Sequence, residues 1–491
     1  MTASHRWITY LTAVLAAAGT QRADAADILF VESGLVPYQV VQCDDAGQAA
    51  LDLAGRVEAA DATVQARIQR GAETLRDWAD CASPEAGKWT AHFDAVPAGG
   101  PYTIELRARD AQGQDLAKKA VDHVLVGDLW ILAGQSNMQG VGNNVDVTPP
   151  SDQVNVFAMN DTWRIAEEPI HRLEESADVV HNGIEDDAKR QGLVANVTNW
   201  TKGAGLGLPF AVELSRLTGR PVGLVACAHG GTSMGQWDPA KRDEGGRSLY
   251  GSMYRRFQAV GGKVRGVLWY QGESDANPDA APIFADLFKN IVQSMRTDFG
   301  NAELPFYYVQ IGRFTNPADA KDWNRAQQVQ LDCESQIPHS AMVTSINLSL
   351  DDGIHIGTQG LKVLGTQFAR IAARDLFKAG TVQNGPRPVS AKRNGSPFGM
   401  RLLVTFSGVN GGLKSDGRVA GFSVSDAEGN PLPNVYDAEI SPVDPNTVIV
   451  WLSEAPAGAK LWYGRGFDPY CNLTDKEGMG VPVFGPMEIS D

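Results

Sequence analysis

The sequence predicts an α/β protein in which a layered α/β domain with a parallel sheet is flanked by two β-rich domains. Three observations support this prediction. The middle of the chain alternates apolar runs with helix-like stretches, both end regions contain short runs with partial polar–apolar alternation, and Gly, Pro and Asp separate those short runs. The 491 residues are enough for several domains, because single cores rarely grow beyond about 250–300 residues.

Residues 1–25 are typical of a secretory signal peptide. Arg6 precedes an apolar stretch at residues 7–18, and Ala23 and Ala25 form a small-residue cleavage pattern. The apolar stretch is too short to span a bilayer comfortably, which argues against a permanent anchor, and no later segment is long and apolar enough. We therefore expect an exported protein, periplasmic or secreted, without a membrane partner.

Charge and cysteine usage exclude several classes of function. The formal net charge of −15 repels nucleic acid and anionic membrane surfaces, so we expect neither as a partner. The five cysteines are an odd number without a C-x-x-C motif, which indicates neither a zinc site nor a redox site. In an exported protein Cys43 and Cys81 could form a disulfide, and buried free thiols explain them equally well.

The first β-rich region, residues 26–122, is expected to form a small sandwich. Its short runs have partial alternation and end at Gly, Pro or Asp, as strands of half-buried sheets do. The clearest runs are 38–43, 62–68, 88–94 and 102–110.

The middle region, residues 123–385, has a different pattern. Its apolar runs lack strict alternation, which suits parallel strands that are buried on both faces. The expected strands are 128–133, 221–228, 265–270, 305–312 and 341–350. The expected helices between and after them are 208–219, 251–260, 281–300 and 361–380. Alternating strands and helices predict a layered α/β domain.

The last region, residues 386–491, returns to the β pattern of the first. Its expected strands are 401–408, 419–426, 446–452 and 459–464, with turns between them. We therefore expect a second β-rich domain at the end of the chain.

Polar sequences follow several of the central strands. They are GQSN at 134–137, HGGTS at 229–233, QGESD at 271–275 and DDGIH at 351–355. The carboxyl ends of parallel strands meet at one edge of a sheet, and ligands bind at that edge. We therefore expect these segments to form one site, although each alone also suits a turn, a solvated loop or a helix N-cap.

The residue types in these segments indicate serine-dependent acyl transfer. The Ser136 hydroxyl becomes a nucleophile only when a base accepts its proton. We expect His355 to be that base, with Asp352 three residues earlier orienting the imidazole and stabilising its charged form. His229 also follows a strand, but the glycine pair after it favours a main-chain role there.

An acyl transfer also needs hydrogen-bond donors for the oxyanion that develops in its transition state. We expect the main-chain N–H groups of Ser136 and Gly231 and the side-chain amide of Gln271 to supply them. Glycine suits this role because the absence of a side chain lets its N–H approach closely.

These segments resemble the motifs of the SGNH hydrolase superfamily, and within it the sialate O-acetylesterase-like and acetylxylan-esterase-like carbohydrate esterases. Matching stretches are G-Q-S-N-M at 134–138, G-G-T at 230–232 with Trp237, W-Y-Q-G-E-S-D at 269–275, D-G-I-H at 352–355 and N-R-A-Q at 324–327. The likeness covers nearly the whole chain after residue 25, although only the central motifs are close.

The resemblance implies a three-layer α/β/α, flavodoxin-like hydrolase domain and a serine esterase that needs no metal or organic cofactor. Gln271 stands where the superfamily name calls for Asn, as in the carbohydrate-esterase branch, and residues 351–360 are closer to the acetylxylan-esterase form. We further expect Asn137, Trp237 and Glu273 to contact the substrate.

The leading hypothesis is therefore an exported serine esterase that removes O-acetyl groups from an acetylated oligo- or polysaccharide. One alternative is a glycan-binding protein without activity. The presence of Ser136, Asp352 and His355 argues against it. Another is hydrolysis of a non-carbohydrate acyl ester by the same residues.

Overall fold

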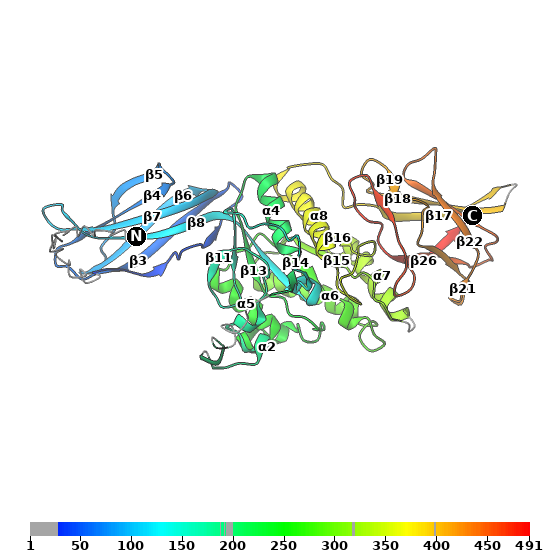
Figure 1. The fold of residues 1–491 in the computed structure, drawn as a ribbon, viewed down its shortest axis with the longest axis horizontal. Helices are drawn as coiled ribbons and strands as arrows, with labels where there is room; N and C mark the ends of the chain where they lie inside the picture. Colours follow the sequence, from blue (N-terminus) through cyan, green and yellow to red (C-terminus); the bar gives the residue numbers. More distant parts are fainter. Residues whose placement is uncertain (1–27, 187, 191, 193–199, 317–319, 397–398) are drawn as a thin grey trace, which may run out of the picture.

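The computed structural model describes residues 28–186, 188–190, 192, 200–316, 320–396 and 399–491. Strands of the first part of the chain lie at one end of the molecule, a mixed α/β region lies in the centre, and strands of the last part lie at the other end (Figure 1). The mixed α/β class is confirmed. The predicted signal peptide, residues 1–25, lies outside the described residues.

Most of the longer N-terminal strands show the alternation of buried and more exposed residues that is typical of half-buried sheets. The N-terminal strands are β1 (Leu29–Gly34), β2 (Val40–Gln42), β3 (Gln48–Val57), β4 (Thr63–Arg70), β5 (Glu73–Asp80), β6 (Lys88–Pro97) and β7 (Gly99–Arg109). β1, β3 and β6 form one sheet, and β4, β5 and β7 belong to another. Inward-facing residues of both sheets, among them Leu51, Ile68 and Trp89, share one apolar core.

The next strand, β8 (Asp115–Gly134), has 20 residues and joins two sheets. Its first part pairs antiparallel with β7, and from Asp128 onward it pairs in parallel with strands of the central sheet. His123, with a φ of 56°, lies where the register with β7 shifts. The expected boundary between residues 122 and 123 therefore falls inside a continuous strand, and the domain limits remain predictions.

The central sheet has the order β11-β10-β13-β8-β14-β15-β16. Its other strands are β10 (Val154–Phe157), β11 (Trp163–Ile165), β13 (Val222–Ala226), β14 (Gly266–Tyr270), β15 (Phe306–Gln310) and β16 (Ser340–Thr344). Neighbours pair in parallel except at the edge strand β11. The five strands that the sequence predicts lie in the order β13-β8-β14-β15-β16, which is the flavodoxin order 2-1-3-4-5, and β10 and β11 extend the sheet beyond β13.

Helices cover both faces of this sheet. They are α1 (Ser136–Gln139), α2 (Val179–Asn182), α4 (Gly207–Thr218), α5 (Leu249–Ala259), α6 (Phe284–Asp298), α7 (Lys321–Gln336) and α8 (Thr358–Phe377). Consecutive residues of a strand point to opposite faces. On β15, Tyr307 stacks on Phe368 of α8, whereas Tyr308 contacts Phe288 of α6. Helices α6 and α8 therefore lie on opposite faces, and α4 packs beside α8.

Short elements complete the central region. They are β9 (Gly142–Asn143), β12 (Lys202–Ala204), η1 (Leu173–Glu175), η2 (Pro239–Arg247) and η3 (Glu273–Asp275). β9 and β12 pair with each other near the carboxyl edge of the sheet, after the turn that follows β8.

The C-terminal strands form a sheet in the order β21-β20-β24-β26-β17-β18-β23-β22 and a separate pair, β19 with β25. They are β17 (Arg387–Ser396), β18 (Gly399–Ser407), β19 (Leu413–Ser415), β20 (Phe422–Ser425), β21 (Pro431–Leu432), β22 (Val435–Ile440), β23 (Thr447–Leu452), β24 (Lys460–Tyr463), β25 (Leu473–Asp475) and β26 (Phe484–Ser490). Buried Gln310 of β15 connects them to the central sheet, because its amide exchanges two 2.9 Å hydrogen bonds with the main chain of Val483.

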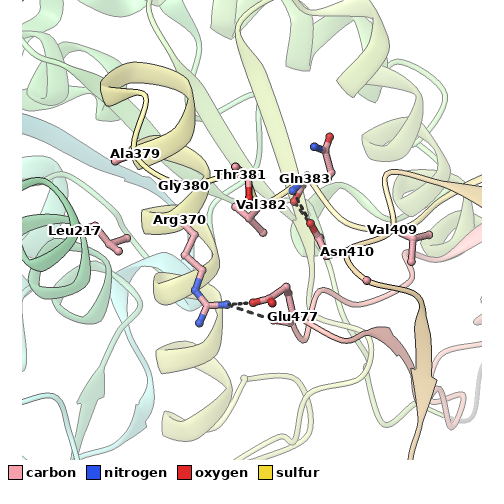
Figure 2. Close-up of a pocket in the computed structure, with 11 residues that line it drawn as sticks. Leu217, Arg370, Ala379, Gly380, Thr381, Val382, Gln383, Val409, Asn410 and Glu477 are labelled. Atoms are coloured by element: carbon pink, nitrogen blue, oxygen red, sulfur yellow. Dashed lines mark hydrogen bonds and ion pairs between the residues drawn. The ribbon is translucent and has the colours of Figure 1, made fainter.

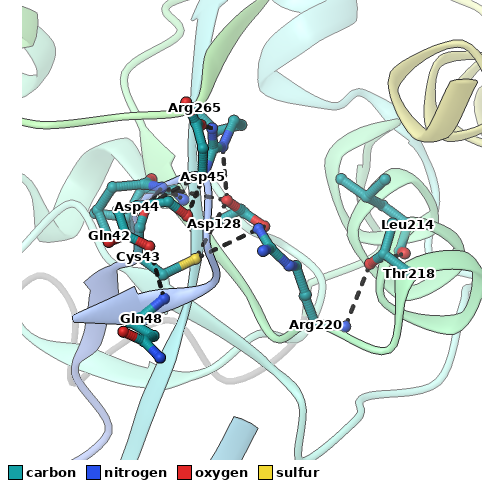
Figure 3. A network of polar contacts seen from close by, with 11 residues as sticks. Gln42, Cys43, Asp44, Asp45, Gln48, Asp128, Leu214, Thr218, Arg220 and Arg265 are labelled. Carbon is teal, nitrogen blue, oxygen red and sulfur yellow. Dashed lines mark hydrogen bonds and ion pairs between the residues drawn. The ribbon is translucent and has the colours of Figure 1, made fainter. Parts of the chain in front are cut away.

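A buried ionic network connects the N-terminal strands to the central sheet (Figure 3). The Asp128 carboxylate on β8 is 1% exposed and accepts hydrogen bonds from Arg265 Nε at 2.7 Å and Arg220 Nη1 at 3.5 Å. Gln42 Nε2, at the end of β2, donates to the same carboxylate at 3.2 Å. Residues far apart in the sequence therefore share one buried charge.

The cysteine beside this network corrects one expectation. All five cysteines belong to the described part of the chain and all are free, so Cys43 and Cys81 form no disulfide. The Cys43 thiol is buried 3.6 Å from Asp128 Oδ1, and burial, followed by the charge of Asp128, raises its pKa to about 11. The buried-thiol alternative is the one that the structure supports.

Candidate active site

Ser136 begins α1 directly after β8, at the carboxyl edge of the central sheet. The turn depends on Gly134, whose φ is +129°; a Cβ atom there would lie only 2.2 Å from the carbonyl oxygen of Tyr270 on β14. The strand order reverses at β8, which is where open α/β sheets bind ligands. The fold thus places a half-buried serine at the position where the sequence predicts the nucleophile.

His355 and Asp352 are brought to Ser136 by the loop between β16 and α8. His355 Nε2 lies 2.9 Å from Ser136 Oγ, and His355 Nδ1 lies 2.9 Å from Asp352 Oδ2. The side chain of His355 is 21% exposed, so the imidazole lies at the surface of the site. The three residues form the continuous hydrogen-bonded arrangement that activation of a serine requires.

Asp352 is held in its ionised form. Although partial burial opposes ionisation, hydrogen bonds from the Ile354 N–H, the His355 side chain and N–H, and Lys202 outweigh it and lower the pKa of Asp352 well below its usual value. Lys202 Nζ, on β12, lies 3.1 Å from Asp352 Oδ2. Sequence analysis did not find Lys202, because no motif connects it with a carboxylate 150 residues away.

Asn137 connects three segments of the site. Its side chain is buried, donates to Glu273 Oε1 at 2.7 Å and accepts from the Ile356 N–H at 3.0 Å. Both ends of its amide are therefore used to hold the His355 loop against the turn after β14. Asn137 therefore helps to position His355, and its expected contact with substrate stays a prediction.

Glu273, in the turn after β14, has one carboxylate oxygen without a partner. Its Oε1 accepts from Asn137, but its Oε2 is buried and has no hydrogen-bond partner within the part of the chain that the structure describes. Burial raises the pKa of Glu273, and the hydrogen bond from Asn137 opposes that rise. The predicted substrate contact of Glu273 stays a prediction.

The glycine pair after β13 lies against Ser136. A Cβ atom on Gly230 would be 3.3 Å from Ser136 Cβ, and the Gly230 N–H donates to Gln139 Oε1 at 2.8 Å. Gly231 is exposed with a φ of +69°, and neither its N–H nor that of Ser136 donates to any described residue. Both N–H groups are available for an added acceptor, and their role as oxyanion donors stays a prediction.

Gln271 directly follows β14, which lies on the opposite side of β8 from β13. Its amide nitrogen donates to Asp275 and, at 3.3 Å, to the carbonyl oxygen of Thr232 beside the glycine pair. Both of its N–H groups are thus engaged within the protein. The predicted donor role would require an oxyanion to replace Thr232, the longer of these two contacts, and it stays a prediction.

Trp237 is the third residue that is expected to contact substrate. It is completely buried, donates from Nε1 to Thr232 Oγ1 at 3.0 Å and packs edge-on against Trp269. Trp237 therefore supports the segment that carries the glycine pair, and its expected contact with substrate stays a prediction.

Other features of the described residues do not add to the site. They contain no cluster of three or more His, Cys, Asp or Glu side chains suited to hold a metal ion, and none of their helices is long and apolar enough to cross a membrane.

A hollow of about 510 Å³ lies between Leu217, Arg370 and Glu477 (Figure 2). It is lined by the C-terminal end of α4 and none of the predicted site residues lines it.

The proteins that this chain resembles are carbohydrate esterases and acetylesterases. The family model described as carbohydrate esterase, sialic acid-specific acetylesterase matches residues 126–374. A probable carbohydrate esterase of Arabidopsis thaliana is 28% identical over 263 residues, which cover 49% of this chain and 88% of that protein. The human sialate O-acetylesterase is 24% identical over 332 residues, which cover 58% of this chain and 60% of the human protein.

One solved structure extends the likeness to the fold as a whole. A carbohydrate acetylesterase from Xanthomonas citri aligns with a TM-score of 0.62 and 22% identity, covering 92% of this chain and 99% of that one. The fold is therefore shared beyond the central sheet.

Proposed function

The chain belongs to the carbohydrate esterase family of sialic acid-specific acetylesterases, and on this premise we propose that it is an exported serine esterase that removes O-acetyl groups from an oligo- or polysaccharide. The observation that carries the proposal is the 2.9 Å contact between His355 Nε2 and Ser136 Oγ. We also propose that the central domain is of the SGNH hydrolase type, and that residues 26–122 and 386–491 form the β-rich domains that flank it.

The first half of the proposed reaction forms an acetyl-enzyme. Ser136 Oγ attacks the carbonyl carbon of the acetyl ester while His355 Nε2 accepts the hydroxyl proton. The negative charge on the carbonyl oxygen is stabilised by the N–H groups of Ser136 and Gly231. Collapse of the tetrahedral intermediate breaks the bond to the sugar oxygen, which leaves as a hydroxyl group with the proton from His355.

The second half restores the serine. His355 removes a proton from water, the hydroxide attacks the acetyl carbon, and acetic acid leaves as Ser136 recovers its proton. Ionised Asp352 holds the imidazole in the tautomer with hydrogen on Nδ1 and stabilises its charged form in both halves. The proposed steps use only these side chains, the two main-chain N–H groups and water.

The test is acetate release from a panel of acetylated glycans, measured for the wild-type protein and for Ser136→Ala. We expect release from at least one acetylated sugar, and loss of it in the variant. Binding of glycans without release would favour the non-catalytic alternative. Faster hydrolysis of long-chain acyl esters than of acetyl esters would favour a non-carbohydrate substrate.

A further inference from the structure

Four polar side chains are connected by hydrogen bonds in a chain that ends on His229, the residue before the glycine pair. Asp178 Oδ2 lies 2.6 Å from Ser252 Oγ, and Ser252 Oγ lies 3.1 Å from His181 Nε2. His181 Nδ1 in turn lies 3.1 Å from His229 Nδ1. The first three residues are buried, whereas His229 is half-buried. The proposed reaction uses none of these side chains.

The hydrogen bonds determine where each proton is. The Asp178 carboxylate also accepts from Arg255 at 2.9 Å, so it acts as an acceptor and the Ser252 hydroxyl must donate to it. Ser252 then has only lone pairs left for His181, which makes His181 Nε2 the N–H donor. Neutral His181 therefore accepts at Nδ1, and the hydrogen between the two rings belongs to His229 Nδ1.

Burial keeps both rings neutral. Desolvation, followed by the neighbouring His229 and Arg256, lowers the pKa of His181 well below its usual value. Burial also lowers the pKa of His229. A neutral His229 with its proton on Nδ1 presents an unprotonated Nε2, which has no hydrogen-bond partner among the described residues and is not enclosed.

The main chain of His229 lies beside Ser136. The His229 N–H donates to the carbonyl oxygen of Gly134 at 3.0 Å, two residues before Ser136, and the next residue is Gly230, which abuts Ser136 Cβ. An O-acetylated sugar bound for attack by Ser136 carries hydroxyl groups next to its ester. A hydroxyl group is the donor that a fixed, neutral acceptor recognises.

We propose that His229 positions the substrate by accepting, at Nε2, a hydrogen bond from a hydroxyl group of the sugar that carries the scissile acetyl ester. The inference rests on the proposed function and adds a requirement to it, namely a free hydroxyl near the ester. Asp178, Ser252 and His181 keep the proton of His229 on Nδ1, so that Nε2 is an acceptor. The site therefore favours a hydrogen-bond donor of the sugar over an acceptor at this position.

Two substitutions distinguish the role of His229 Nδ1, which contacts His181, from the proposed role of His229 Nε2. His229→Asn retains an N–H donor near Nδ1 for His181 but removes the Nε2 acceptor, whereas His229→Gln can place its amide oxygen near the position of Nε2. The measured quantity is the ratio of kcat/KM for an acetylated sugar to kcat/KM for p-nitrophenyl acetate, which has no sugar hydroxyl. We expect Asn to lower this ratio about 10-fold, the scale of one net hydrogen bond, and Gln to retain more of it.

His92→Asn is the matched control, because His92 is an exposed histidine on β6 and should leave the ratio unchanged. An unchanged ratio in folded His229→Asn would overturn the inference. A wild-type protein that hydrolyses p-nitrophenyl acetate but releases acetate from no acetylated sugar would instead refute the proposed function, and the inference with it.

The tautomer can be measured without substrate. In ¹⁵N-labelled protein, with the His229 resonances assigned by comparison with His229→Asn, we expect an unprotonated Nε2 and a protonated Nδ1 near neutral pH. Ser252→Ala removes the acceptor that orients His181 and should perturb this pattern. A protonated Nε2 in the wild-type protein would contradict the accepting role.

Discussion

Ser136 depends on one neighbour for its reactivity, since no other titratable side chain of the described residues is hydrogen-bonded to its hydroxyl. His355 in turn has its second nitrogen on Asp352, and Asp352 is shared with Lys202. At the scale of single residues, the proposed function therefore depends on a linear series of hydrogen bonds, and each bond can be removed by a separate substitution.

Removal of either end of the reactive pair should abolish esterase activity. Ser136→Ala eliminates the nucleophile and His355→Ala eliminates the base, so each should lower kcat on the order of 10³-fold or more. Steady-state kinetics on a short acetyl ester, with circular dichroism to verify folding, is the measurement. Near-normal turnover in either folded variant would refute the assignment.

Asp352→Asn should lower kcat by less than His355→Ala and should shift the pH profile. Because the pKa of Asp352 is lowered in the folded protein, its charge persists through mildly acidic pH and stabilises the protonated imidazole. Without that charge the imidazole releases its proton more easily, and the acid limb of kcat/KM should move to lower pH.

Lys202→Met is the matched control for this change. It removes a half-exposed partner of Asp352 and leaves the carboxylate in place, so kcat should stay within about 10-fold of the wild type. An acid limb that moves to higher pH in Asp352→Asn would mean that Asp352 does not face a protonated base.

The D-x-x-H and G-Q-S-N motifs made Ser136, Asp352 and His355 predictable, since their spacing reflects local geometry. Exposure is different, because it depends on which segments pack over a residue. Asn137 and Trp237 lie in the right motifs but are buried, so their supporting roles could be found only in three dimensions.

At the scale of elements, the site is a set of turns that brace one another across the ends of neighbouring strands. Gln135 Oε1 accepts from the N–H groups of Gly272 and Ser274, at 3.4 and 3.2 Å. Asp275 accepts from the Met234 N–H at 2.9 Å and from Gln271. The turns after β8, β13 and β14 are therefore coupled.

Gln271→Ala tests what the turn after β14 contributes. If its amide stabilises the oxyanion, kcat should fall roughly 10²-fold with little change in KM, because that bond strengthens only in the transition state. Gln271→Glu should be at least as harmful, since a carboxylate would repel the oxyanion. Kinetics on a short acetyl ester measures both, with exposed Gln293→Ala on α6 as control.

A normal kcat with a raised KM in Gln271→Ala would contradict the donor role. It would leave Gln271 as a brace for the carbonyl group of Thr232, the contact that it makes in this structure.

Element prediction succeeded where apolar residues carried the pattern and was incomplete elsewhere. The expected strands at 128–133, 265–270 and 305–312 contain or overlap β8, β14 and β15. Helix α7 gives a weak apolar signal, because its buried positions include Asn324, Gln327 and Gln330. Those amides hydrogen-bond the main chain of neighbouring loops, a pairing that no hydrophobic pattern can show.

At the scale of the whole molecule, the network at Asp128 should contribute strongly to stability. Asp128→Ala leaves Arg220 and Arg265 largely buried without their shared anion, and breaking a buried pair in this way costs about 3–5 kcal/mol. Urea denaturation should therefore show a lower free energy of unfolding.

Asp45→Ala is the control for this prediction. Asp45 pairs with the same Arg265, but its side chain is 97% exposed, and surface pairs are worth about 0–1 kcal/mol. Equal losses in the two variants would show that burial of Asp128 does not determine the strength of the network.

The continuity of β8 has a consequence for how this molecule can be taken apart. A cut after residue 122 would divide one strand, because residues 115–122 would stay with β7 while the remainder of β8 would begin at a new chain end a short distance before Ser136. The N-terminal strands are thus connected to the central sheet through a continuous strand and not through a linker. A truncated or chimeric protein in which the N-terminal strands are removed or exchanged should therefore keep β8 whole.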